Sequence, residues 1–304
     1  MPRFQTTYIS SQIMTWHKLS PTILTLLIFL LAQGLGTILL FGIIILISPE
    51  FNAAVQAYMS GEAQSLPLLE MMSVSTFSLI LMVVDVLAVL GCYFLLHNIR
   101  LLKADDFSTI KWRPGILAIA GGVLGAISIS ILTEKVPLPD TMLQMSHAMS
   151  HNIVGLLALV LVGPITEELL FREAIEGEML RRGTNPWLAI IISAIAFGFA
   201  HLNFAQGLYA FPLAILFGII YYKTGNIVLT SLLHILNNGI AAIQLNTQGE
   251  NFSELTYADL FGSQVSAYII MLLFGSLSIL FMMRFWASYP INKQTCNKTG
   301  VMNG

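Results

Sequence analysis

The chain is poor in charged residues. Asp, Glu, Lys and Arg make up only 10% of its 304 residues, whereas an ordinary soluble domain has about 25%. Hydrophobic residues account for 56%, and the mean hydropathy is +0.79. This composition excludes a soluble globular domain and predicts an integral membrane protein.

Cysteines and clustered basic residues are also scarce. The two cysteines, Cys92 and Cys296, can form neither a disulfide framework nor a thiolate metal site. The basic residues are spread over the loops and form no patch, which excludes nucleic acid as a partner. The lipid bilayer is therefore the first partner that we expect.

Long hydrophobic runs dominate the sequence instead. A bilayer core of about 30 Å takes roughly 20 apolar residues per helix. Eight segments qualify, some of them only as half of a hairpin: 22–48, 73–97, 115–133, 152–180, 186–203, 207–222, 226–246 and 259–286. The first is longer than a signal-peptide core, so we interpret it as a retained anchor. The sequence thus predicts an all-α, polytopic membrane protein with about eight transmembrane helices.

The loops between these segments differ in charge. All 14 Lys and Arg residues except Lys135 and Arg172 fall on one side of the membrane in this arrangement. By the positive-inside rule that side is the cytoplasm, so both termini are predicted to be cytoplasmic. The residues are Arg3, Lys18, Arg100, Lys103, Lys111, Arg113, Arg181, Arg182, Lys223, Arg284, Lys293 and Lys298.

Residues 164–173, PITEELLFRE, place three charged side chains inside or beside the fourth segment. An ionised side chain near the bilayer centre costs about 2.5–3.5 kcal/mol. Glu168 and Arg172 are four residues apart, so on a helix they share a face and can pair. Glu167 points about 100° away from that face. The spacing predicts that Glu168 is structural and that Glu167 is the free carboxylate.

Two histidines also lie inside predicted membrane helices, each with a partner one turn away. Phe197 precedes His201 by four residues, so its ring can pack against the imidazole and restrict its rotamers. His234 and Asn238 have the same spacing and present two polar side chains to one face. Both pairs are candidates for a site within the membrane.

The turn between the fourth and fifth segments predicts the depth of these groups. Gly183 ends one helix and Pro186 opens the next. Glu167 and His201 are equally distant from this turn, so in an antiparallel hairpin they lie level, roughly 25 Å from it at 1.5 Å per residue. His234 reaches the same depth if the fourth helix projects about 10 Å beyond the membrane.

Two other polar features lack a motif. Asp85 is a further intramembrane carboxylate, which we interpret as a paired structural group or a neutral acid. The Met-rich stretch MLQMSHAMSH at residues 142–151 is typical of packing at the membrane interface, and a border of a substrate entrance is the alternative.

Three motifs in this region resemble those of the CPBP intramembrane proteases. EELLFR at residues 167–172 matches EExxxR, FGFAH at 197–201 matches FxxxH, and HILNN at 234–238 matches HxxxN. The family includes type II CAAX prenyl endopeptidases and bacterial bacteriocin-processing and abortive-infection-type proteins. The resemblance covers about residues 152–245, and Glu173 replaces the glycine that many members have there.

The resemblance implies a hydrolase of the bacterial plasma membrane that cleaves a peptide or membrane-associated protein without a cofactor. Glu167 would be the general base that activates water, and His201 would position that water. His234 and Asn238 would stabilise the oxyanion. The supporting residues would be Glu168, Arg172 and Phe197.

The chain is accordingly divided into three parts. Residues 1–151 contain the first three membrane helices with their loops, and residues 152–246 form the catalytic core of four helices. Residues 247–304 contain the last helix and a polar tail.

Two alternatives remain open. A glutamate and two histidines are a ligand set that zinc accepts, so the same residues could serve a zinc-dependent protease, although no HExxH motif is present. The protein could also be a non-catalytic membrane immunity or scaffold protein, or a proton-coupled transporter. A transporter favours inverted repeats, and none is evident in the sequence.

Overall fold

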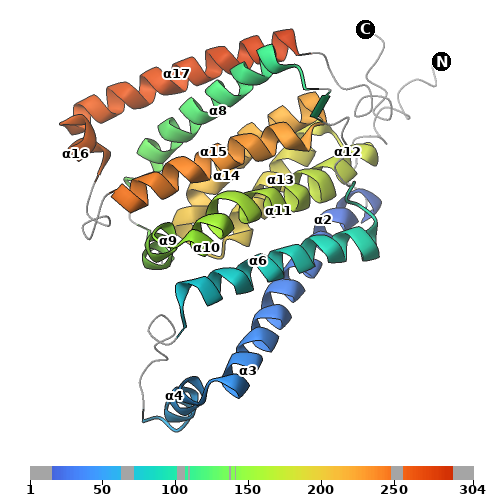
Figure 1. Cartoon of the computed structure of the whole chain (residues 1–304). Helices are drawn as coiled ribbons and strands as arrows, with labels where there is room; N and C mark the ends of the chain where they lie inside the picture. The colour runs from blue at the N-terminus through green and yellow to red at the C-terminus, as the bar shows by residue number, and fades with distance from the viewer. Residues whose placement is uncertain are drawn as a thin grey trace.

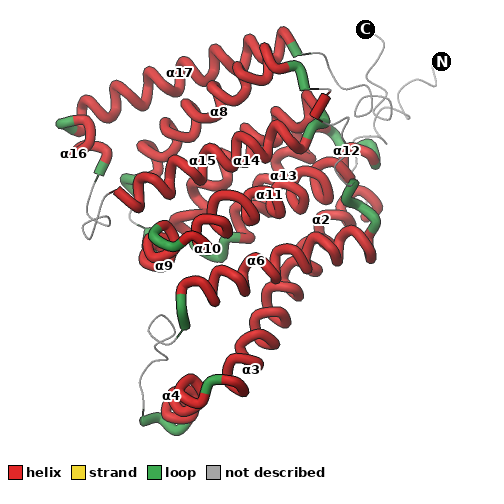
Figure 2. Tube along the Cα trace, viewed as in Figure 1, coloured by secondary structure: helices red, strands yellow, loops and turns green. Residues whose placement is uncertain are grey.

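The structure is a computed structural model that describes residues 16–62, 72–100, 107–108, 110–136, 138–140, 142–247 and 256–289. Over these ranges all regular structure is helical and no strand occurs. The predicted all-α class is therefore confirmed, as the tube in Figure 2 shows. Of the residues discussed above, Arg3, Lys103, Lys293, Cys296 and Lys298 lie outside the described ranges.

The helices form a bundle (Figure 1), with α8 between α17 and the pair α14 and α15. On the other side, α6 and α2 pack near α11 and α12, and α3 leads away to α4. Their bounds are α2 (Trp16–Leu31), α3 (Thr37–Ile47), α4 (Pro49–Met59), α6 (Val74–Gly91), α8 (Trp112–Thr133), α9 (Leu143–Ser150), α13 (Pro186–Ala200), α14 (Phe204–Thr224), α15 (Ile227–Thr247), α16 (Tyr257–Phe261) and α17 (Gln264–Ser288).

Seven helices in the described part of the chain are long and apolar enough to cross a membrane. The remaining expected segment, 186–203, corresponds to α13, which has only 15 residues. At 1.5 Å per residue it reaches about 22 Å, less than the bilayer core of about 30 Å. It therefore serves as half of a hairpin with α14. The last expected segment, 259–286, is divided into two helices, because Gly262 takes a left-handed conformation (φ 81°) between α16 and α17.

The fourth span is not a single α-helix. It consists of α10 (Ile153–Leu156), a π-helix η3 (Leu157–Val162), α11 (Gly163–Glu168), a second π-helix η4 (Leu169–Gly177) and α12 (Glu178–Arg181). Such π segments occur frequently at functional sites. The apolar pattern could not predict them, because it does not distinguish one helical hydrogen-bond register from another.

Side chains of neighbouring elements bond to the backbone of η4. Ser193 of α13 donates to the Phe171 carbonyl at 2.7 Å, and Asn98 donates to the Ala174 carbonyl at 3.2 Å. These bonds anchor the π-helix inside the bundle. The turn that follows is built as predicted, with Gly183 at a φ of 75° and Pro186 at the start of α13.

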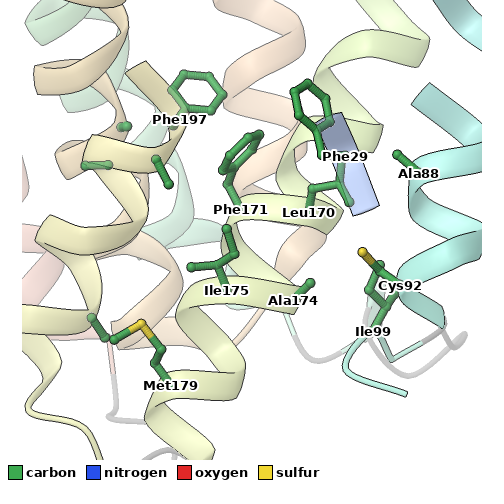
Figure 3. Close-up of a cluster of buried hydrophobic side chains, with 14 of the residues drawn as sticks. Phe29, Ala88, Cys92, Ile99, Leu170, Phe171, Ala174, Ile175, Met179 and Phe197 are labelled. Atoms are coloured by element: carbon green, nitrogen blue, oxygen red, sulfur yellow. The ribbon is translucent and has the colours of Figure 1, made fainter. Parts of the chain in front are cut away.

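Hydrophobic packing holds this span against the first helix and α13 (Figure 3). The Phe171 ring is at the centre, 6.2 Å from the Phe29 ring and 5.1 Å from the Phe197 ring. Ile175 and Met179 are fully buried below it. The helix that carries the two glutamates is thus tied to α2 and α13 by large apolar side chains.

Small residues bring α8 and α17 close together on the other side of the bundle. Ser278 of α17 donates to the Gly121 carbonyl at 2.6 Å, and Ser128 donates to the Met271 carbonyl at 2.9 Å. A Cβ at Gly125 would lie 2.8 Å from Ser278 Oγ. Close approach through small residues and interhelical hydrogen bonds is typical of membrane helix pairs.

Two of the loop cations, Arg182 and Lys223, contact residues near the first and the last described helix. Arg182 Nη1 donates to the His17 carbonyl at 2.8 Å, at the start of α2. The Lys223 ammonium lies 4.4 Å from the centre of the Trp286 ring, near the end of α17. The described part of the chain therefore begins and ends on the same side. That this side is cytoplasmic stays a prediction.

Candidate active site

The predicted pair of Glu168 and Arg172 is present and fully buried. Arg172 Nε lies 3.3 Å from Glu168 Oε2, and neither side chain has any exposed surface. The guanidinium carbon is 5.0 Å from the centre of the Phe197 ring and 5.6 Å from that of Phe217. Aromatic faces attract a guanidinium, so Arg172 is held by one carboxylate and two rings.

His234 connects the two adjacent glutamates. Its Nδ1 is 3.0 Å from Glu168 Oε1, and its Nε2 is 3.5 Å from Glu167 Oε2. An ionised carboxylate only accepts hydrogen bonds, so Nδ1 carries a proton and donates to Glu168. The ring orientation is thereby set, and Nε2 faces Glu167.

The two glutamates differ in exposure as helix geometry predicted. The Glu167 side chain is 30% exposed, whereas that of Glu168 is 0% exposed. From the position of the turn, Glu167 was predicted to lie level with His201. The ionic contact of Glu167 in the described part of the chain is instead with His234, 67 positions away and on α15. The sequence could not rank these two histidines by distance.

His201 lies beside the same group of residues. Its Nδ1 donates to the Phe197 carbonyl at 2.9 Å, and the two rings are 4.9 Å apart and nearly perpendicular. The Phe197 ring is also 5.8 Å from that of His234. One aromatic side chain therefore contacts both histidines, which agrees with the predicted common depth. Because Nδ1 carries the proton, Nε2 of the neutral ring is an acceptor.

A cavity of about 250 Å³ is lined by His201, His234 and Asn238. Leu143 and Ser146 of α9 form part of its wall. The Met-rich stretch thus borders the cavity; that it frames a substrate entrance stays a prediction. Because both histidines and the asparagine open into one space, a bound molecule there could contact all three.

The Asn238 side chain is held by neighbours that the sequence analysis missed. Its Nδ2 donates to the Leu159 carbonyl at 3.0 Å, and its Oδ1 accepts from Asn237 Nδ2 at 3.1 Å. The Tyr209 hydroxyl donates to Asn237 Oδ1 at 2.7 Å. Asn237 stands next to the motif asparagine in the sequence, but no local signal marks Tyr209.

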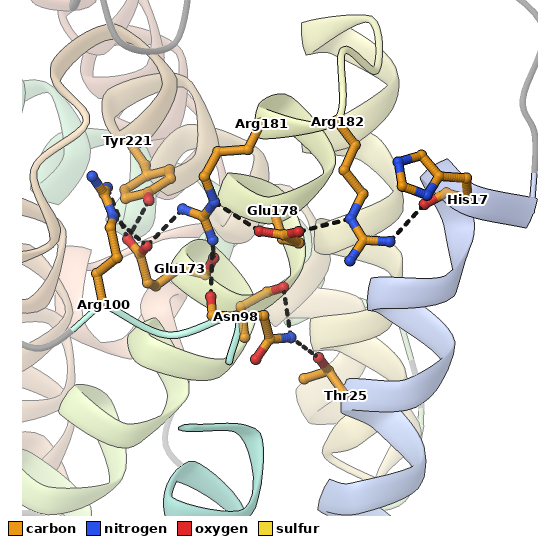
Figure 4. Close-up of polar contacts among 10 residues, drawn as sticks. His17, Thr25, Asn98, Arg100, Glu173, Glu178, Arg181, Arg182 and Tyr221 are labelled. Atoms are coloured by element: carbon orange, nitrogen blue, oxygen red, sulfur yellow. Dashed lines mark hydrogen bonds and ion pairs between the residues drawn. The ribbon is translucent and has the colours of Figure 1, made fainter. Parts of the chain in front are cut away.

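Glu173, which lies just outside the first motif, is the centre of a second charged cluster (Figure 4). Its Oε1 is 2.8 Å from Arg100 Nε and 2.7 Å from Arg181 Nη1. Tyr221 donates to its Oε2 at 2.5 Å. The Glu173 carboxylate also raises the pKa of Arg100 above its ordinary value. The sequence offered no signal for this cluster beyond the charges themselves.

Glu178 extends this cluster. Its two oxygens lie 2.8 Å from Arg181 Nε and 2.7 Å from Arg182 Nε. We refer to Glu173, Glu178, Arg100, Arg181, Arg182 and Tyr221 as the arginine cluster.

Two further intramembrane carboxylates lie apart from the arginine cluster. Asp85 Oδ1 accepts a hydrogen bond from Gln33 at 2.8 Å, which agrees with a paired structural group. Glu176 is fully buried, and neither of its oxygens has a hydrogen-bond partner among the described residues. A Cβ at Gly218 would lie 2.8 Å from its Oε2, so the glycine makes room for it.

The described residues contain no group of three or more His, Cys, Asp or Glu side chains arranged to hold a metal ion. Both nitrogens of His234 already face carboxylate oxygens, and His201 Nδ1 is used by a backbone carbonyl. Zinc binding by these histidines would require at least one of these contacts to be rearranged.

The fold and the site together define a polytopic membrane protein in which two histidines and an asparagine line a cavity within the bundle, and two glutamates contact one of these histidines. The family of Rce1-like type II CAAX prenyl endopeptidases matches residues 149–240. UPF0177 protein YxdF of Lactococcus lactis subsp. lactis (strain IL1403) is 31% identical over 157 residues, which are 47% of this chain and 82% of that protein.

A second similar protein is "Putative membrane peptidase YdiL" of Bacillus subtilis (strain 168). It is 30% identical over 94 residues, which are 31% of this chain and 38% of that protein. No solved structure matches the chain. The chain belongs to the CPBP family of intramembrane proteases and is a multi-pass protein of the bacterial plasma membrane.

Proposed function

We propose that this protease hydrolyses a peptide bond with a water molecule activated by Glu167. The observation that carries the proposal is the contrast between the two adjacent glutamates. Glu168 is buried and ion-paired, whereas Glu167 is 30% exposed and has only the His234 imidazole as an ionic neighbour in the described structure. A general base must reach its substrate proton, and Glu167 is the one of the two that can.

In this mechanism the water lies between Glu167 and His201. His201 Nε2 accepts one hydrogen bond from the water, and the Glu167 carboxylate takes the other proton. The water oxygen then attacks the peptide carbonyl carbon. As the C–N bond breaks, protonated Glu167 returns its proton to the leaving amine. The glutamate ends the cycle in the form in which it began.

The tetrahedral intermediate carries a negative oxygen, which His234 and Asn238 stabilise. With His234 as imidazolium, Nδ1 donates to Glu168 and Nε2 is free to donate to the oxyanion once Glu167 is protonated. Before the proton transfer, two carboxylates, one guanidinium and one imidazolium sum to zero charge. In the intermediate the oxyanion replaces the Glu167 carboxylate, so the sum stays at zero, which suits a site inside a membrane. Donors of this kind are worth about 2.7–4 kcal/mol each in a water-poor site.

Glu168 and Arg172 act by holding His234. The buried carboxylate fixes the imidazole through Nδ1 at 3.0 Å, and the guanidinium neutralises that carboxylate. A carboxylate behind a histidine commonly sets its tautomer and orientation. We also propose that no metal takes part, because the mechanism assigns His201 Nε2 to the water and His234 Nε2 to the oxyanion.

The test compares purified wild-type protein with Glu167→Gln on a library of quenched fluorescent peptides. The matched control is Glu173→Gln, which removes the same charge six residues along the same span. We expect Glu167→Gln to lose about a thousandfold or more in kcat, and Glu173→Gln to keep its activity per folded molecule. Full activity of Glu167→Gln would contradict the glutamate mechanism.

The same assay separates the alternatives. Loss of wild-type activity with a strong chelator, restored by zinc, would show a zinc-dependent protease. Failure of the wild type to cleave any peptide, with a cellular phenotype that survives Glu167→Gln, would indicate a non-catalytic role. The library also identifies the substrate class, for which prenylated proteins, leader peptides and membrane-protein fragments are all compatible with the site.

A further inference from the structure

The candidate oxyanion residue Asn238 ends a chain of hydrogen bonds. Tyr209 of α14 donates to Asn237, which donates to Asn238, which donates to the Leu159 carbonyl of η3. The three distances are 2.7, 3.1 and 3.0 Å. The chain therefore joins three separate elements of the bundle, α14, α15 and the π-helix η3.

The direction of this chain follows from its two ends. The Leu159 carbonyl can only accept, so the end of Asn238 that faces it is the NH₂ group. Asn238 Oδ1 then faces Asn237 and requires a donor, which turns the Asn237 NH₂ group toward it. Asn237 Oδ1 in turn faces Tyr209, whose hydroxyl donates. Reversal of either amide would place two donors or two acceptors together.

This direction of the hydrogen bonds leaves the second N–H of Asn238 for a bound molecule. A carboxamide nitrogen has two hydrogens, and Leu159 uses one of them. Asn238 lines the cavity together with His234 and His201, so the other N–H is available to a molecule bound there. An asparagine with its oxygen in that position would repel an oxyanion.

We infer that Tyr209 and Asn237 are positioning residues, which hold Asn238 with its N–H group toward the substrate. The inference rests on the proposed role of Asn238 as an oxyanion donor and extends it to two residues outside the motifs. Neither residue needs to touch the substrate. A preorganised donor avoids reorganisation at the moment of reaction, so the loss should appear in kcat and leave KM unchanged.

Tyr209 and Asn237 also form the wall between two cavities, which limits the choice of variants. Both line a second cavity of about 130 Å³, next to Ser130 and Tyr257, as well as the site cavity. Truncation of either side chain would join the two spaces and confuse the result. Tyr209→Phe keeps the ring and removes only the hydroxyl, and Asn237→Leu keeps a similar volume.

The experiment is a pair of double-mutant cycles in the intact protein. Tyr209→Phe and Asn237→Leu are each made in the wild type and in an Asn238→Ala background, and kcat, KM and the melting temperature are measured. One hydrogen bond corresponds to a loss of about threefold to tenfold in kcat. We expect that loss in the wild-type background, with KM unchanged, and no further loss in the Asn238→Ala background.

Equal losses in both backgrounds would overturn the inference, because the two residues would then act independently of Asn238. Unchanged kcat in the single variants would overturn it as well. The cycles are repeated with Asn238→Asp, which keeps the size and removes the N–H donors, so that poor folding of one background leaves the other. If Asn238→Ala and Asn238→Asp are both as active as wild type, the proposed oxyanion role fails and the inference fails with it.

Discussion

The span from α10 to α12 carries two groups of acidic residues with different surroundings. Glu173 and Glu178, near its end, are contacted by three arginines, and Glu173 by a tyrosine as well. Glu167 and Glu168, less than two turns before Glu173, both contact His234, and Glu168 also pairs with Arg172. Of these four carboxylates, Glu167 is the one without an arginine contact among the described residues; Glu176, which lies between Glu173 and Glu178, is fully buried and has no hydrogen-bond partner there either.

In the proposed mechanism, this difference separates the structural carboxylates from the one that takes part in the chemistry. A charge inside a membrane is tolerated when it is paired or opens into a polar space. Residues of the arginine cluster are paired, and they join α2, the segment after α6, α12 and α14 at one end of the bundle. Glu167 relies instead on a cavity-lining histidine and partial exposure. Because the Glu167 carboxylate is partly exposed and has no arginine partner, the proposed mechanism uses it for proton transfer.

The greatest effect is expected from Arg172→Met. Removal of the cation leaves the fully buried Glu168 carboxylate without its neutralising partner, which costs about 3–5 kcal/mol. We expect a large fall in the melting temperature in detergent, or failure to accumulate in the membrane.

The matched variant is Glu168→Gln combined with Arg172→Met. It removes both charges, so most of the stability should return, whereas activity should not, because His234 has lost its anchoring carboxylate. Recovery of both properties would show that the pair has no part in catalysis.

The next effect concerns His234. His234→Ala removes a donor to the oxyanion, and we expect kcat to fall by about 10²–10³-fold. His151→Ala is the control, because His151 is exposed beyond α9 and should leave kcat unchanged. Steady-state kinetics on the best library peptide measure both. Equal activity of the two variants would remove His234 from the mechanism.

A smaller effect, on stability alone, is expected at the arginine cluster. Glu173→Gln weakens hydrogen bonds from Arg100, Arg181 and Tyr221, and buried hydrogen bonds to a charged group contribute about 1.5–3 kcal/mol. The melting temperature should fall while kcat per folded molecule stays constant. A selective loss of kcat at full stability would mean that the cluster also acts on the site.

The smallest effect is expected for Arg182→Ala. The Arg182 side chain is 26% exposed and shares Glu178 with Arg181. Partly exposed ion pairs contribute about 0–1 kcal/mol and are screened by salt. Thermal unfolding at low and high ionic strength should therefore show a small difference that shrinks with salt. A loss as large as that of Arg172→Met would contradict the distinction between the buried pair and the cluster.

Much of the fold could be predicted because bilayer thickness translates directly into segment length. Seven of the eight expected segments correspond to helices of spanning length in the described chain. The Glu168 and Arg172 pair could also be predicted, since residues four apart on a helix are neighbours whatever surrounds them. The motif spacing indicated the family and named four of the residues that line the cavity, Phe197, His201, His234 and Asn238.

Other features depended on packing between distant segments. The contact of His234 with both glutamates joins residues 66 and 67 positions apart, and no local periodicity encodes which helix lies against which. The same holds for four other features that depend on packing: the π-helices η3 and η4, the short α13, the hydrogen bonds from Tyr209 to Asn238, and the surroundings of Glu173. Local spacing therefore specified the helices and the candidate residues, whereas tertiary packing left Glu167 accessible and enclosed Glu168, because burial and pairing depend on all the helices together.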